Sequence, residues 1–159
     1  MNNEMLKPVE AGAGEIAKAS PKKPTLVYSC SGCSDAGEIA DRVARRLTRE
    51  GAAQMSCLAG IGGRVKSLVM KAENAGRILV VDGCPLNCAA HTLRLAGFKN
   101  FEHLELHRIG IRKGSCPVTD EKISAGVEAA KKILAGEPNQ PADPDEVDAG
   151  QIETAAVAA

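Results

Sequence analysis

The sequence has almost no aromatic residues and no excess of either charge. It contains no Trp, one Tyr and two Phe, so aromatic residues make up 2% of the 159-residue chain. A core for a domain of this length must therefore be built from Ala, Val, Leu and Ile. Twenty basic residues balance twenty acidic ones. We therefore expect no general nucleic-acid binding, which requires a basic surplus.

Long hydrophobic runs are also missing. No apolar run is long enough to cross a membrane. The first five residues, 1–5, have neither the charged start nor the apolar middle of a signal peptide. We therefore expect a cytoplasmic protein without membrane association. In that reducing compartment, six cysteines indicate metal ligation or redox chemistry rather than structural disulfides.

The composition divides the chain into three parts. Residues 1–23 are rich in Lys, Glu, Ala and Gly and predict a flexible N-terminal arm. Residues 24–136 contain the periodic apolar segments of a folded domain. Pro, Asp, Glu, Gln and Ala dominate residues 137–159, which predicts a disordered C-terminal tail.

Strand-like and helix-like segments alternate along the central part. The apolar runs with strand character cover residues 25–29, 53–58, 77–81 and 101–109. The segments with helical spacing cover residues 36–47, 65–72, 85–97 and 123–134. This alternation predicts an α/β fold, a three-layer, mostly parallel four-stranded sheet of the Rossmann or flavodoxin-like kind. The last strand alternates polar and apolar residues, which predicts one solvated face and a place at the sheet edge.

The stretch 80–89 joins a buried strand to a helix. Asp82 and Gly83 predict a turn after the strand. Pro85 suits the first position of a helix, where its missing N–H costs nothing. This pattern predicts Cys84 at the strand–helix junction and Cys88 about one turn into the helix, where the helix dipole favours thiolates.

All six cysteines follow or end predicted strands. Because the carboxyl ends of parallel strands share one edge of the sheet, we expect these thiols to converge there. The six are Cys30 and Cys33 after the first strand, Cys57 ending the second, Cys84 and Cys88 after the third, and Cys116 after the fourth.

The spacing of two cysteine pairs predicts a metal site. Cys30 and Cys33 together with Cys84 and Cys88 provide four sulfurs, which suits a tetrahedral zinc ion. Cys57 and Cys116 could replace one ligand or lie nearby as redox partners. The same soft ligands suit an iron–sulfur cluster, but none of the compact ferredoxin spacings is present, so zinc is favoured.

Two residues near the cysteine pairs are candidates for supporting roles. His91 could be a ligand or an acid–base group sharing a helical face with Cys84 and Cys88, although a plain surface or core histidine explains it as well. Asp82 could support a metal ligand, but its position favours accepting N–H bonds within its own turn.

Two weaker patterns remain. His103, Glu105 and His107 alternate on one face of the last predicted strand, which a solvated face explains better than a second metal site. Residues 59–63 predict a flexible turn whose N–H groups, those of Gly60, Gly62 and Gly63, could hold a small anion. The stretch lacks the P-loop and dinucleotide patterns. Phosphate-ester chemistry is disfavoured, because Ala36 rather than Arg stands six residues after Cys30.

Three motifs together resemble the DGC-domain family, named for its Asp-Gly-Cys motif. They are residues 28–35, 57–62 and 81–89, and the resemblance extends over residues 25–135. It implies zinc binding through four cysteines and no particular reaction. The best matches to those four are Cys30, Cys57, Cys84 and Cys88, so the choice between Cys33 and Cys57 stays open.

Two other classes of function fit the sequence. One is a thiol or persulfide enzyme in which Cys30 or Cys84 is the nucleophile and Cys33 or Cys88 resolves the intermediate. The other is a binding or assembly module whose tails recruit a protein partner. A small sulfur-containing or anionic ligand would suit either of them.

Overall fold

A four-stranded parallel sheet forms the centre of the molecule. The computed structural model describes residues 23–32 and 34–137. The strands are β1 (Thr25–Ser29), β2 (Gln54–Met55), β3 (Arg77–Asp82) and β4 (Glu102–Glu105), and their spatial order is β2-β1-β3-β4. All three neighbouring pairs are parallel. The α/β prediction is therefore confirmed, and the order matches the flavodoxin-like arrangement.

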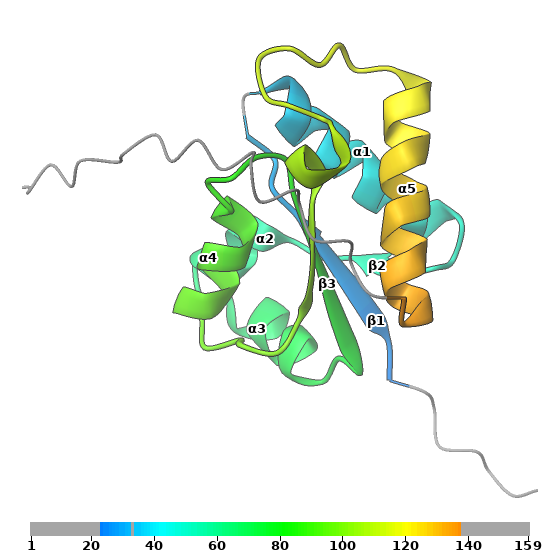
Figure 1. The fold of residues 1–159 in the computed structure, drawn as a ribbon. Helices are drawn as coiled ribbons and strands as arrows, with labels where there is room; N and C mark the ends of the chain where they lie inside the picture. The colour runs from blue at the N-terminus through cyan, green and yellow to red at the C-terminus, as the bar shows by residue number, and fades with distance from the viewer. Residues whose placement is uncertain (1–22, 33, 138–159) are drawn as a thin grey trace, which may run out of the picture.

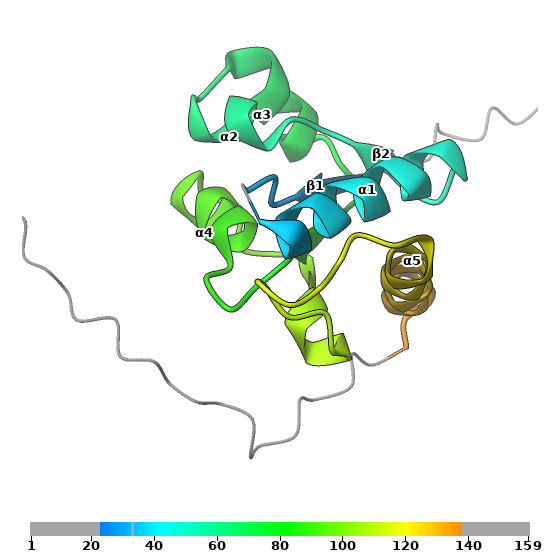
Figure 2. The same ribbon diagram turned by 90° about the horizontal axis from the view of Figure 1, so that it is seen from above.

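Helices cover both faces of this sheet (Figures 1 and 2). Helix α1 (Asp35–Arg49) packs against α5 (Asp120–Ala135) on one face. On the other face lie α2 (Leu58–Gly62), α3 (Lys66–Glu73) and α4 (Cys88–Leu95), with α2 in contact with α4. This placement follows from right-handed crossovers, because the chain moves in one direction from β1 to β2 and in the other from β2 to β3 and β4.

The core is aliphatic, as the scarcity of aromatic residues predicted. Strands β1 and β3 are nearly continuous apolar runs because helices cover them on both faces. The single tyrosine, Tyr28, is fully buried in β1. Helix α1 turns Ile39, Val43 and Leu47 toward the sheet. Ser34 caps this helix by accepting a hydrogen bond from the Gly37 N–H at 3.1 Å, as its sequence position predicted.

Two predicted segments differ from the structure. The strand expected over residues 101–109 ends at Glu105 and continues as a 3-10 helix, η1 (Leu106–Ile109). β4 lies at the sheet edge as expected, but Glu105 is 8% exposed, so the prediction of a solvated face was wrong there. The turn expected over residues 59–63 is mostly the short helix α2, because Cys57 caps its first turn.

The point where the chain changes direction lies between β1 and β3. These two strands are neighbours, and the chain leaves β1 toward one edge of the sheet and β3 toward the other. In open parallel sheets, ligands bind beyond the carboxyl ends of the strands at this switch point. No helix within residues 23–32 and 34–137 is long and apolar enough to span a membrane. The two predicted tails and Cys33 lie outside the described residues, apart from the boundary residues 23 and 137.

Candidate functional site

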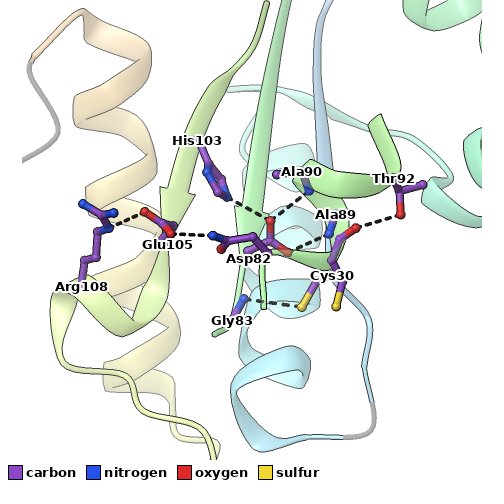
Figure 3. A network of polar contacts seen from close by, with 11 residues as sticks. Cys30, Asp82, Gly83, Ala89, Ala90, Thr92, His103, Glu105 and Arg108 are labelled. Atoms are coloured by element: carbon purple, nitrogen blue, oxygen red, sulfur yellow. Dashed lines mark hydrogen bonds and ion pairs between the residues drawn. The ribbon is translucent and has the colours of Figure 1, made fainter. Parts of the chain in front are cut away.

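Cys30 lies at the switch point, directly after β1. Its N–H continues the β1–β3 pairing by donating to the Val81 carbonyl at 2.9 Å. Its thiol is 8% exposed and accepts a hydrogen bond from the Gly83 N–H at 3.5 Å (Figure 3). The first cysteine of the Cys-x-x-Cys pair therefore packs directly against the Asp-Gly-Cys turn of β3.

The surroundings of Cys30 favour a neutral thiol. Burial raises the pKa of this thiol most, and negative charge on Asp82 and Cys84 raises it further, while the Gly83 N–H lowers it. The Cys30 sulfur contacts the N–H of Gly83, the residue just before Cys84, although 53 positions separate Cys30 from Gly83 in the sequence. The segments that carry Cys30 and Cys84 therefore meet at the end of the β1–β3 pair, and the convergence of the thiols themselves stays a prediction.

Gly83 allows this close approach. A Cβ atom at this position would lie 2.6 Å from the backbone carbon and oxygen of Ala36 and 2.9 Å from the Gly37 nitrogen. The turn after β3 therefore packs directly against the backbone of the first turn of α1. The middle residue of the Asp-Gly-Cys motif has to be glycine because the obstructing atoms are backbone rather than movable side chains.

Helix α4 begins later than the sequence predicts. Residues 84–87 form a turn in which the Asn87 N–H donates to the Cys84 carbonyl at 3.1 Å. Asn87 adopts the left-handed conformation (φ 48°, ψ 42°), so the first helical residue is Cys88. The predictions that Pro85 starts the helix and that Cys88 lies one turn inside it were therefore wrong. Cys84 is half-buried in the turn, while Cys88 is exposed at the helix start.

Asp82 is the buried anchor of this helix. Its side chain is fully buried, and it accepts hydrogen bonds from the Ala89 N–H at 2.9 Å and the Ala90 N–H at 3.0 Å. Both donors belong to the first turn of α4, whose N–H groups have no partner within the helix. The role expected for Asp82 within its own turn is thus replaced by capping a helix that starts six residues later.

A second set of polar contacts comes from the edge strand (Figure 3). His103 Nε2 lies 2.9 Å from Asp82 Oδ2, because the register between β3 and β4 places His103 opposite Val80 on the same face as Asp82. Glu105 accepts a hydrogen bond from the Asn87 side-chain amide at 2.9 Å and forms an ion pair with Arg108. Sequence reasoning noted the alternation of His103 and Glu105 but treated it as a solvated face, and it missed both contacts.

Cys57 and Cys88 start the neighbouring helices α2 and α4. Cys57 is exposed, and its sulfur accepts a hydrogen bond from the Gly60 N–H at 3.4 Å. Helices α2 and α4 contact each other, so Cys57 and Cys88 are exposed at the starts of two neighbouring helices.

Cys116 lies beside a different carboxylate, that of Asp35. Its thiol is buried, and its N–H donates to Asp35 Oδ2 at 3.0 Å. Burial raises the pKa of the Cys116 thiol, and its contact with the Asp35 carboxylate raises it further. The charged groups that act on this thiol are Asp35 and Lys122, from the N-terminal turns of α1 and α5.

The remaining candidates are not gathered at the switch point. His91 is exposed on α4 and cannot share a helical face with Cys84, which precedes that helix. His107 belongs to η1 rather than to a strand, and burial lowers its pKa. Gly60 and Gly62 are helical residues of α2, and the Gly63 N–H donates to the Ala59 carbonyl. The N–H groups of Gly60 and Gly63 are therefore occupied within the chain.

The donors present have the chemistry of a zinc site without a complete ligand arrangement. Thiolates are the ligands that structural zinc prefers, and Cys30, Cys84 and Cys88 come from the two segments that meet at the switch point. Within residues 23–32 and 34–137, no group of three or more His, Cys, Asp or Glu side chains is placed to hold a metal ion. The described part of the chain thus contains the Cys30 thiol, packed against the Asp-Gly-Cys turn, and the hydrogen bonds by which Asp82 holds the start of α4.

Comparisons with known proteins agree with this description. The family model described as "DGC domain" matches residues 26–130, which include both strands of the switch point and the Asp82–Cys84 motif. The "Anaerobic and virulence modulator AnvM" of Pseudomonas aeruginosa PAO1 is 44% identical over 95 residues, covering 59% of this chain and 72% of the relative. No solved structure matches the chain significantly. The chain therefore belongs to the DGC domain family.

Proposed function

We propose that this protein binds zinc through cysteine thiolates at the carboxyl ends of β1 and β3. Cys30, Cys84 and Cys88 would be three of the ligands, and Cys57 or Cys33 the fourth. The observation that supports the proposal is the contact of the Cys30 sulfur with the Gly83 N–H at 3.5 Å, which brings the first cysteine motif against the Asp-Gly-Cys turn at the switch point.

A bound metal ion would stabilise the thiolate form of Cys30, which its surroundings disfavour. This thiol is buried close to the Asp82 carboxylate, and both features oppose its deprotonation. A dication bound at the site favours thiolates and would offset this opposition. When bound, zinc would supply a cross-link between loops that follow separate strands.

The remaining ligands would come from helices that are already fixed in place. The bonds from the Ala89 and Ala90 N–H groups to Asp82 hold the backbone next to Cys88. The exposed Cys88 thiol can rotate about its Cα–Cβ bond, whereas the exposed Cys57 sulfur would exchange its hydrogen bond from the Gly60 N–H for the metal. We infer that metal binding orients these thiols, while the backbone needs no large change.

The raised pKa of Cys30 weighs against this residue as the nucleophile of a thiol enzyme. A nucleophilic cysteine is active as the thiolate and has a lowered pKa. Burial and the Asp82 charge have the opposite effect at Cys30. An iron–sulfur cluster would use the same thiolates and is distinguished by its visible absorption.

The name of the Pseudomonas relative suggests a regulatory role for that protein. That protein is named an anaerobic and virulence modulator. We extend to this chain only the inference that the metal site belongs to a binding protein with a regulatory role. Thiolate ligands are sensitive to oxidation, so metal occupancy would respond to oxidants.

Metal content of the purified protein tests the proposal. Protein prepared without added metal is analysed for zinc and iron, together with its visible spectrum, and Cys84→Ala is compared with Cys116→Ala as a matched control. We expect about one zinc per chain, no visible cluster absorption, and loss of zinc in Cys84→Ala alone. Cys116→Ala should retain its zinc because its buried thiol lies beside Asp35.

Two results would refute zinc binding at the switch point. One is wild-type protein that neither contains zinc nor binds it on titration under reducing conditions. The other is zinc that remains undiminished in a folded Cys84→Ala variant. Removing the metal with a chelator then tests whether zinc supports the fold. If the zinc is structural, the melting temperature of the protein should fall when the metal is removed.

A further inference from the structure

We propose that His103 is a positioning residue of the thiol site, acting through Asp82 on the first turn of α4. The inference rests on the proposed function where it concerns metal, and on the described contacts alone where it concerns α4. His103 belongs to β4, outside the cysteine motifs, and it contacts Asp82. Its effect would pass through one buried carboxylate.

The first step is the orientation of Asp82. Its Oδ1 accepts the Ala89 N–H at 2.9 Å, and its Oδ2 accepts the Ala90 N–H at 3.0 Å. His103 Nε2 lies 2.9 Å from the same Oδ2 atom. The Asp82 side chain is 1% exposed and the His103 side chain 18%, so little water can replace either partner. The histidine therefore fixes the rotation of a carboxylate whose two oxygens hold α4.

The second step is the dependence of α4 on this carboxylate. The residue at the N-cap position, Asn87, is left-handed and makes no capping hydrogen bond with its side chain. The helix has eight residues, which is too short to be stable in isolation. Asp82 therefore supplies the side-chain cap that Asn87 does not provide. Misorienting Asp82 should loosen the first turn of α4 rather than the whole domain.

The third step connects that turn to the thiols. Cys88 is the first residue of α4 and immediately precedes Ala89, whose N–H is held by Asp82. The Cys30 sulfur accepts a hydrogen bond at 3.5 Å from the N–H of Gly83, the residue after Asp82. Asp82 is thus next in sequence to the group that contacts Cys30, and its carboxylate holds the backbone next to Cys88. His103, which contacts this carboxylate, would therefore act on the placement of Cys88 relative to Cys30.

His103 also contacts the residue that precedes its strand. The ring of Phe101 meets the His103 ring edge to face, with centroids 6.2 Å apart and planes at 87°. Glu105 provides a separate brace to the same loop through the Asn87 amide at 2.9 Å. Because this second brace is independent of His103, replacing the histidine should leave the fold intact while changing the thiol geometry.

The test compares His103→Phe with His103→Gln. Phe keeps an aromatic ring and removes the hydrogen-bonding nitrogen, whereas the Gln amide can still donate to Asp82. His91→Phe is the matched control, because His91 lies exposed on α4 itself. Zinc affinity is measured by competition with a chelator, and the cobalt-substituted protein is examined for its thiolate-to-metal absorption. Amide hydrogen exchange of Ala89 and Ala90 is measured in metal-free, reduced protein.

We expect His103→Phe to weaken zinc binding about 10–100-fold, the usual range for partners behind the ligands. Its cobalt spectrum should change, and the Ala89 and Ala90 amides should exchange faster than they do in wild-type protein, with the strand amides of β1 and β3 as the internal reference. His103→Gln should restore most of each property, and His91→Phe should change none of them. A merely structural role for His103 would lower overall stability without altering the cobalt spectrum of the folded fraction.

Two failures can be told apart. If wild-type protein binds neither zinc nor cobalt, the proposed function fails, and the amide exchange of Ala89 and Ala90 still decides the positioning role. If wild-type protein binds metal but His103→Phe matches it in affinity, spectrum and amide exchange, the role of His103 is refuted.

Discussion

Asp82 and Asp35 are two carboxylates that hold cysteine-bearing backbone in opposite environments. Asp82 is fully buried and binds the first turn of α4 beside Cys88. Asp35 is partly exposed at the start of α1 and accepts hydrogen bonds from the N–H groups of Ala36, Gly114 and Cys116 at 2.8–3.1 Å. Each carboxylate thus supplies hydrogen-bond acceptors to backbone N–H groups that would otherwise have none within their own segment.

The difference between them lies in what surrounds the charge. Asp82 shares its oxygens with His103 inside the protein, where an unpaired partner is costly. Asp35 is bound by backbone N–H groups at the surface, which lower the pKa of its carboxyl far below the usual range. We infer that Asp82 controls the stability and geometry of the thiol site. Asp35 controls mainly the attachment of the Cys116 loop.

The largest effect is expected from Asp82→Ala. This change leaves two helix N–H groups and His103 without their buried acceptor, which should lower the free energy of unfolding by about 3–5 kcal/mol. Urea denaturation followed by circular dichroism measures the loss. As a control, Asp41→Ala removes a partly exposed acid, 22% exposed at its side chain, that contacts Arg45 at 2.6 Å on α1 and should cost about 0–1 kcal/mol. Equal losses in the two variants would contradict the contrast between buried and surface carboxylates.

A smaller effect is expected from Gly83→Ala. The added Cβ would meet the Ala36 backbone at 2.6 Å, so the turn after β3 must move away from α1, at a cost of about 1–3 kcal/mol. The matched variant is Gly32→Ala, because a Cβ at Gly32 meets no atom within 4 Å. Thermal denaturation should show a clear decrease in Tm for Gly83→Ala and little change for Gly32→Ala. The reverse order would rule out the backbone contact as the reason for this glycine.

The smallest effect is expected from Asp35→Asn, and it should depend on pH. Because the folded-state pKa of Asp35 is lowered, its contribution to stability is complete above the ordinary aspartate value of about 4. That contribution is lost as the pH falls below this value toward the folded-state pKa. The stability difference between wild type and Asp35→Asn should therefore be largest at neutral pH and shrink in acid. Denaturation midpoints measured at several pH values, with Asp41→Asn as control, check this; a difference that grows in acid would contradict it.

The sequence was informative about the strands and the thiols that follow them. Buried apolar runs identified β1 and β3, and the rule that parallel strands end at one edge placed Cys30 beside the Asp-Gly-Cys turn. The alternation in β4 also put His103 and Glu105 on one face. What the alternation could not reveal was the partner of that face, because a period of two is the same whether the polar side chains meet water or other side chains, here those of Asp82 and Asn87.

The start of α4 shows how a local signal can mislead. Proline is common at the first helical position, so Pro85 predicted an early start. In the structure Asn87 is left-handed and the helix begins at Cys88. The Asp82 oxygens accept hydrogen bonds from the next two N–H groups, those of Ala89 and Ala90. The position of the cap, which follows from the end of β3, overrides the local preference of proline.

By itself the sequence determined the α/β class, the aliphatic core and the meeting of the Cys30 segment with the Asp-Gly-Cys turn, because each follows from local periodicity and strand direction. Only the tertiary structure decided that Asp82 caps α4, that His103 reaches Asp82 across 21 positions, and that Asp35 holds Cys116 across 81. These contacts depend on strand register and on loops meeting at the sheet edge. Such long-range geometry leaves no periodic trace in the chain.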